Sequence, residues 1–124
     1  MKRRMIQWLW IAALTALLGF MSVANAEESK GITNPYDGRA DLIPKGKTLF
    51  NVHCSHCHGP NAVQGERKRD LRRLSRRYKD RMPAVFYQTA TTGHTTKGMP
   101  SWKGILKDEE LWTIFTFLKT VQKK

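Results

Sequence analysis

The chain has few of the residues that zinc sites and dithiol enzymes need. Among its 124 residues are only two cysteines, Cys54 and Cys57, and four histidines. A structural zinc site normally takes a second pair of ligands from further along the chain, and only His94 is available there. The βαβ pattern that accompanies a thioredoxin-type dithiol is also absent. These absences make both explanations of the cysteine pair unattractive.

The N-terminus has the composition of a secretory signal. Three basic residues, Lys2, Arg3 and Arg4, precede an uncharged and mostly apolar stretch at residues 6–21, and Ala24-Asn25-Ala26 resembles a cleavage site. We therefore expect residues 1–26 to be a cleaved signal peptide, residues 27–40 an extended arm, and residues 41–124 one small domain. An uncleaved membrane anchor is the alternative. The expected location is the periplasm.

Acidic residues are scarce. The sequence has 10 Asp and Glu against 22 Lys and Arg, and losing the three leader cations would lower its formal charge from +12 to +9. Such an excess indicates an acidic partner, an anionic surface or nucleic acid. An exported protein rarely meets nucleic acid, so we expect acidic partner proteins, no nucleic acid and at most peripheral membrane contact.

The two cysteines belong to Cys54-Ser55-His56-Cys57-His58, a C-x-x-C-H pattern. This spacing is the attachment signature of a c-type haem, because one helical turn lets both thiols reach neighbouring vinyl groups. The following histidine, His58, can then bind the iron. A disulfide between the cysteines, or a zinc or copper site that adds His53 and His56, remains an alternative.

Helical patterns dominate the rest of the chain. Residues 41–53 carry Pro44 early and apolar residues along one face, and Gly46 would allow another helix to approach closely. Residues 82–93 start near Pro83 and end at Gly93. The last helix should begin after an N-cap at Asp108. Its predicted apolar face consists of Leu111, Ile114, Phe115, Leu118 and Val121.

Residues 66–81, which we call the basic segment, contain nine Lys or Arg and three acids. Leu71, Leu74 and Tyr78 recur at helical spacing within it and predict a narrow apolar stripe. The segment is either a solvated surface helix or a docking face for an acidic redox partner, whose encounter rate the charge would raise.

The order of these motifs resembles the class I cytochrome c family: a helix with G-x-x-x-F, then C-x-x-C-H, a late Met-Pro and an amphipathic last helix. The resemblance implies a small all-α fold of about four to five helices around one covalent haem c. The N- and C-terminal helices would cross, with Phe117 and Leu118 against Gly46 and Phe50. It also implies electron transfer without substrate turnover, so no catalytic residues are expected.

The resemblance also suggests the sixth iron ligand. Met99 lies in a glycine-containing loop, and Pro100 biases it toward an extended backbone. Met82, His94 or an open position are the alternatives, and an open position would instead suit a haem sensor or small peroxidase. Trp102 either packs in the core or donates its indole N–H to a haem propionate.

One departure from the family concerns the proximal histidine. Many members carry a Gly-Pro-x-Leu segment after the haem motif, and its proline carbonyl accepts from the Nδ1–H of that histidine. This chain has Pro60 directly after His58-Gly59 and no later Gly-Pro-x-Leu. The acceptor for the second nitrogen of His58 is therefore open.

Residues 69–74 and the run Gly-Met-Pro-Ser-Trp-Lys-Gly-Ile-Leu at 98–106 are similar to small cytochromes that serve quinoprotein alcohol dehydrogenases. This likeness implies a dehydrogenase as electron donor and an oxidase or another cytochrome as acceptor. We expect a monomer.

Overall fold

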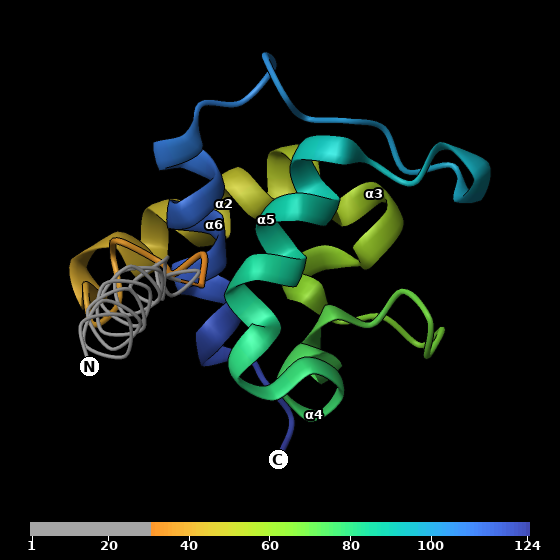
Figure 1. Cartoon of the computed structure of the whole chain (residues 1–124). Coiled ribbons are helices and arrows are strands. Elements are labelled where there is room, and N and C mark those ends of the chain that lie inside the picture. The colour runs from red at the N-terminus through yellow and green to blue at the C-terminus, as the bar shows by residue number, and fades with distance from the viewer. Residues whose placement is uncertain (1–30) are drawn as a thin grey trace, which may run out of the picture. The chain divides into compact units, whose positions relative to one another are not determined.

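The computed structural model describes residues 31–124. The predicted signal peptide, and with it the alternative membrane anchor, lies outside the described residues, as does the start of the predicted arm. Within residues 31–124 the regular elements are all helical (Figure 1). They are η1 (Ala40–Leu42), α2 (Ile43–His53), α3 (Ser55–His58), η2 (Pro60–Ala62), η3 (Leu71–Arg73), α4 (Leu74–Tyr78), η4 (Lys79–Arg81), α5 (Met82–Thr92), η5 (Thr95–Lys97) and α6 (Asp108–Thr120).

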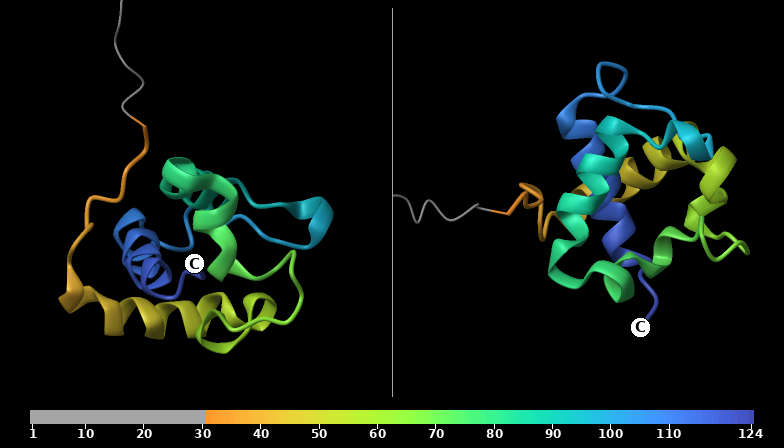
Figure 2. Two further views of the ribbon diagram at one scale, coloured as in Figure 1. Left: turned by 90° about the horizontal axis from the view of Figure 1, so that it is seen from below. Right: turned by 45° about the vertical axis from the view of Figure 1, so that its right-hand side comes forward.

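The all-α prediction is confirmed, and the first and last long helices cross as expected. Helix α6 packs against both α2 and α5 (Figure 2). At the crossing, a Cβ on Gly46 would lie 2.2 Å from the carbonyl oxygen of Thr113 and 3.0 Å from the Cβ of Phe117. The rings of Phe50 and Phe117 meet with centroids 5.6 Å apart. Only glycine at position 46 permits so close an approach.

Helix α6 is more buried than its sequence pattern predicts. Every residue from Leu111 to Leu118 is buried, including Thr113 and Thr116 outside the predicted apolar face. The two threonine hydroxyls donate to backbone carbonyls one turn earlier, at 2.6 and 2.9 Å. Asn34 of the N-terminal segment also donates to the Thr116 hydroxyl, at 3.0 Å. Satisfied hydroxyls make the burial of this polar side of α6 tolerable.

The start of α6 corrects the predicted cap. The N-cap residue is Lys107, one position before Asp108, and its backbone N–H donates to the carboxylate of Glu110 at 2.9 Å. Asp108 is instead the first helical residue, where its charge complements the positive end of the helix.

The basic segment is not one continuous helix. Its first five residues form turns, and helical structure begins only at Leu71, with Asp70 as the N-cap of η3. Lys79 has a positive φ of 48°, which breaks the segment between α4 and η4. The predicted apolar stripe is nevertheless present, because Leu74 is buried and Leu71 and Tyr78 pack beside it.

Helix α5 has the predicted bounds, with Pro83 in its first turn and Gly93 at its C-cap. Phe86 faces the core, where its ring lies 5.0 Å from that of Phe115. Within residues 31–124, no helix combines the length and apolar character needed to cross a bilayer.

We predict that Gly46→Ala lowers the thermal stability of the protein. The added Cβ would overlap a backbone oxygen of α6, and overpacking of this kind costs about 1–3 kcal/mol, more than the gain of about 1 kcal/mol in helix propensity. The melting temperature followed by circular dichroism should fall by several degrees. Gly31→Ala is the matched control, because no atom lies within 4 Å of its Cβ position. Equal melting temperatures for the two variants would contradict the close crossing.

Candidate functional site

The two cysteines and His58 share one helical turn that continues directly from α2. The amide of Cys54 donates to the carbonyl of Phe50 at 2.8 Å, and the amide of His58 donates to the carbonyl of Cys54 at 3.0 Å. All three side chains are half-buried. Helix α3 and its N-cap residue Cys54 therefore present two thiols and an imidazole from a single turn, and α2 fixes where that turn begins.

A pair of asparagines clamps α3 between α2 and the following turn. Asn51 donates to the side-chain oxygen of Asn61 at 2.9 Å, and its own side-chain oxygen accepts from the Asn61 amide at 2.8 Å. Ser55 adds a hydroxyl bond to the Asn51 carbonyl at 2.6 Å. These bonds restrain both ends of the cysteine turn.

The structure shows which group accepts from the second ring nitrogen of His58. Its Nδ1 lies 2.8 Å from the carbonyl oxygen of Arg69. A carbonyl can only accept, so Nδ1 carries the proton and Nε2 keeps its lone pair. That tautomer is the one a metal-ligating histidine needs, with its second nitrogen oriented by an outer partner. Arg69 therefore takes the place of the proline in the family's Gly-Pro-x-Leu segment.

Sequence reasoning missed this acceptor because the contributing group is a backbone carbonyl, which any residue type supplies. The only available signal was position: Arg69 lies two residues before Leu71, as the proline lies two residues before the leucine in Gly-Pro-x-Leu.

The residue after this acceptor, Asp70, is 3% exposed and lies at the centre of a polar network. Its carboxylate accepts from the backbone amide of Arg72 at 3.1 Å, from the Arg72 guanidinium at 2.8 and 3.1 Å, and from the Lys123 ammonium at 3.1 Å. The Arg72 guanidinium, followed by Lys123, holds the pKa of the Asp70 carboxyl well below its usual range.

The two cysteines are half-buried thiols. Both are free, and burial raises the pKa of the Cys54 thiol to about 12, with a further contribution from Cys57. A redox-active C-x-x-C pair shows the opposite, a lowered thiol pKa. Within residues 31–124 no three His, Cys, Asp or Glu side chains gather as ligands for a metal ion. The disulfide, dithiol and zinc or copper alternatives therefore receive no support from the site.

The loop that carries Met99 is closed on itself by two backbone bonds. The amide of His94 donates to the Met99 carbonyl at 2.8 Å, and the amide of Met99 donates to the His94 carbonyl at 3.1 Å. Gly93 packs against this loop, because a Cβ there would lie 2.9 Å from the Met99 carbonyl oxygen. Met99 is half-buried and His94 is exposed. Of the alternatives, Met82 is 7% exposed and packs in the core with Trp112 and Phe115.

The Met99 loop and α3 lie at the same end of the molecule in Figures 1 and 2. Trp102, which follows the loop, makes an edge contact with the ring of His53, with centroids 5.6 Å apart. Like Cys54, it packs against the core cluster that contains Phe50 and Leu118, and its amide donates to the carbonyl of Ala90 in α5 at 2.9 Å. The predicted packing role of Trp102 therefore has a structural basis, and it connects the loop to the start of the cysteine turn.

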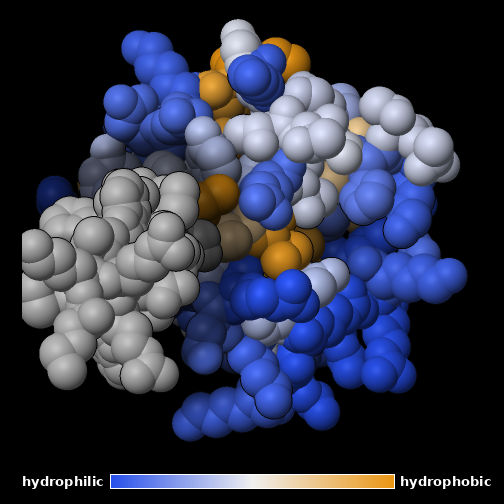
Figure 3. All heavy atoms as spheres, viewed as in Figure 1, coloured by the Kyte–Doolittle hydropathy of each residue, from blue (hydrophilic) through white to orange (hydrophobic). Residues whose placement is uncertain are grey.

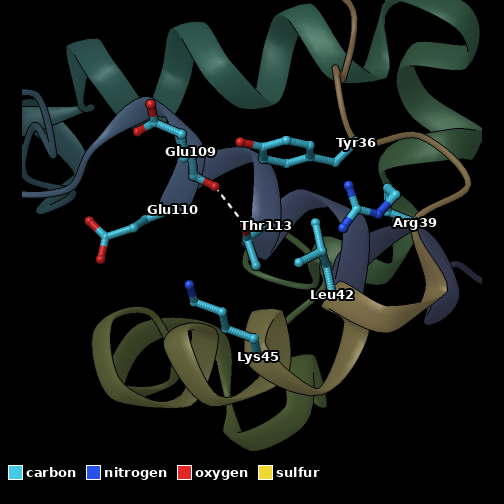
Figure 4. A pocket seen from close by; sticks show the side chains of 7 residues that line it. All are labelled: Tyr36, Arg39, Leu42, Lys45, Glu109, Glu110 and Thr113. Carbon is cyan, nitrogen blue, oxygen red and sulfur yellow. Dashed lines mark hydrogen bonds between the residues drawn. The ribbon is translucent and has the colours of Figure 1, made fainter.

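A surface pocket lies elsewhere, between α2, the start of α6 and the N-terminal segment (Figure 4). It is lined by Tyr36, Arg39, Leu42, Lys45, Glu109, Glu110 and Thr113. None of the predicted site residues borders it, and its mixed charges select no particular ligand.

Two thiols on one turn, followed by a histidine with a free Nε2, fit the covalent attachment of a haem and define a class I cytochrome c. Residues 41–118 match the family described as cytochrome c oxidase, cbb3-type, subunit III. The chain belongs to this family of c-type cytochrome domains. It is therefore an electron-transfer domain that carries haem c.

One curated relative is the quinohemoprotein alcohol dehydrogenase ADH IIB of Pseudomonas putida. It is 30% identical over 80 residues, which make up 64% of this chain and 11% of that protein. The chain thus spans only a small part of this relative. No solved structure matches the chain.

We predict that the Asp70 network makes the fold sensitive to acid. Because the pKa of Asp70 is lowered in the folded state, its ion pairs stabilise the fold above the ordinary aspartate pKa of about 4, and this stabilisation is lost as the pH falls through the folded-state pKa. Asp70→Asn should cost about 1–3 kcal/mol near neutral pH and progressively less in acid. Thermal unfolding across this pH range measures the difference.

The matched control is Asp41→Asn, which removes an exposed ion pair with Arg39 and should change stability little at any pH. A destabilisation by Asp70→Asn that stays constant down to about pH 2 would contradict the ionised network.

Proposed function

We propose that this protein is a periplasmic one-electron carrier with a single haem c. In this proposal Cys54 and Cys57 hold the porphyrin covalently, and His58 and Met99 are the axial ligands. The haem supplies the one-electron redox couple. The observation that carries the proposal is the bond between His58 Nδ1 and the Arg69 carbonyl, because it leaves Nε2 free and aimed by a fixed outer partner.

The assignment of Met99 as the sixth iron ligand is supported by the positions of the two alternative ligands, Met82 and His94. Met82 is buried in one core cluster with Trp112 and Phe115, so moving it would open a cavity there. His94 is exposed, whereas Met99 is half-buried in a loop that backbone bonds hold in shape. A thioether in the sixth position also leaves no open coordination site, which suits a carrier better than a sensor or peroxidase.

We predict that Met99→Ala abolishes the weak long-wavelength absorption band by which a thioether–Fe(III) bond is recognised. The reduction potential should fall as well, because thioether ligation raises it. The control is Met82→Leu, which keeps the core volume and should cost less than about 1.5 kcal/mol. If Met82→Leu removes the band and Met99→Ala keeps it, the ligand assignment is wrong.

The donor in this proposal is a quinoprotein alcohol dehydrogenase with an acidic docking face, and the acceptor is an oxidase or a second cytochrome. The likeness to part of the Pseudomonas putida dehydrogenase supports the proposed donor. Hydrophilic side chains cover the side of the molecule formed by α4 and the loop before it (Figure 3), and the exposed cations among them support an acidic face on the donor. Arg67, Lys68, Arg76 and Arg81 are among the exposed cations of this basic segment.

Electron transfer from a reduced dehydrogenase should be steered by these cations. We predict that Arg76→Gln with Arg81→Gln lowers the second-order rate of haem reduction by about tenfold at low salt, and that the difference narrows as salt screens the charges. Stopped-flow mixing measures the rate. Lys45→Gln with Lys47→Gln is the matched control, since it removes two exposed cations from α2. No reduction of the wild-type protein at physiological salt would exclude this donor.

A further inference from the structure

The carbonyl that accepts from His58 is part of a peptide unit whose other end is Asp70. The Arg69 carbonyl and the Asp70 amide lie in one plane, because the peptide bond does not rotate freely. The Asp70 amide donates to the Glu66 carbonyl at 3.1 Å, opposite to the direction of the Arg69 oxygen. Whatever fixes Asp70 therefore fixes where the Arg69 oxygen points.

The Asp70 side chain is held more firmly than any other carboxylate described in residues 31–124. It is 3% exposed and accepts four hydrogen bonds, three from Arg72 and one from Lys123. Charge-assisted bonds of this kind are about twice as strong as neutral ones. The local chain of residues 70–72 is thereby locked into the N-cap of η3.

Two further sets of hydrogen bonds connect residues 70–72 to other parts of the chain. The C-terminal tail is one of them: the Lys123 amide donates to the Arg72 carbonyl at 2.7 Å, and the side chain of Gln122 donates to the Leu71 carbonyl at 3.0 Å. The haem motif is the other. Arg72 donates to the carbonyl of Gln64 at 3.2 Å, and the side chain of Gln64 donates to the carbonyl of Cys57 at 3.0 Å.

We propose that Asp70 is a positioning residue for the proximal ligand: clamped by Arg72 and Lys123, it holds the Arg69 carbonyl against the Nδ1–H of His58 and so tunes the reduction potential of the haem. This role rests on the proposed ligation by His58. It gives the C-terminal tail a part in setting the potential, although Lys123 does not touch His58.

The expected sign follows from the chemistry of the imidazole. A strong bond from Nδ1–H to a carbonyl makes the ring a better electron donor and favours the oxidised iron. Loosening Asp70 weakens that bond, so the potential should rise and the Nδ1 proton should exchange faster with solvent. A purely structural role for Asp70 would lower stability without changing either readout in the folded protein.

The experiment uses the reduced, diamagnetic holoprotein and compares variants of equal formal charge. Lys123→Met removes one clamp, and Lys124→Met removes the exposed lysine beside it. Asp70→Asn removes the centre of the network, and Asp80→Asn removes an exposed carboxylate of the same basic segment. NMR measures the exchange rate of the His58 Nδ1 proton, and a redox titration gives the potential of each variant.

We expect exchange about tenfold faster in Asp70→Asn than in Asp80→Asn, which corresponds to about 1.4 kcal/mol, together with a higher potential. Lys123→Met should show a smaller change in the same direction relative to Lys124→Met. Equal exchange rates and potentials within both pairs would overturn the positioning role. If Asp70→Asn does not accumulate as holoprotein, the lysine pair decides alone.

The same samples separate this proposal from the one on which it rests. If the wild-type protein shows no covalent haem, or no exchangeable proton on a ligated His58, the proposed function fails first. If both are present and the variants match their controls, only the role of Asp70 fails.

Discussion

The close crossing of α2 and α6 at Gly46 is the contact on which the rest of the structure depends. A backbone oxygen of α6, that of Thr113, occupies the space where any larger residue of α2 would place its Cβ. This contact fixes the direction of α2, and α2 ends at His53, directly before the turn that carries Cys54 and His58. The position of the haem motif is thus set by packing between two helices that lie far apart in the sequence. The haem would extend a core that a chain of this length can build only to a limited size.

The sequence predicted most of this fold because the relevant signals are local. Pro83 and Gly93 mark the ends of α5 in the sequence, and the structure agrees. The burial of α6 could not be predicted to the same degree. Thr116 looks like a solvent-facing residue in a periodic pattern, but Asn34, 82 positions earlier, covers it and satisfies its hydroxyl. The predicted N-cap of α6 was wrong by one residue, because the backbone N–H of Lys107 donates to the Glu110 carboxylate. The capping preferences of single residues do not reveal such a bond.

The candidate site also has a part that the sequence could predict and a part that it could not. Spacing alone predicts the two thiols and His58 as the haem-binding residues, because a covalent haem demands that arrangement. Spacing could not identify the Arg69 carbonyl, since every residue carries one and only the folded chain determines which lies 2.8 Å from His58. The network behind it, from Asp70 to the tail at Lys123, likewise joins residues more than 50 positions apart. The basic segment therefore combines a buried carboxylate, which ion pairs hold in place, with cations that are exposed on the surface.

Extraction of the purified protein tests most directly whether the turn from Cys54 to His58 holds a covalent haem. Protein matured through an export pathway is treated with acidified acetone, which removes haem that is not covalently bound, and the visible spectrum of the residue is recorded. The account predicts that one haem per chain stays with the protein, and that Cys54→Ser with Cys57→Ser leaves none attached. Complete extraction of haem from the wild-type protein, or a purified protein that holds another metal in its place, would contradict the account.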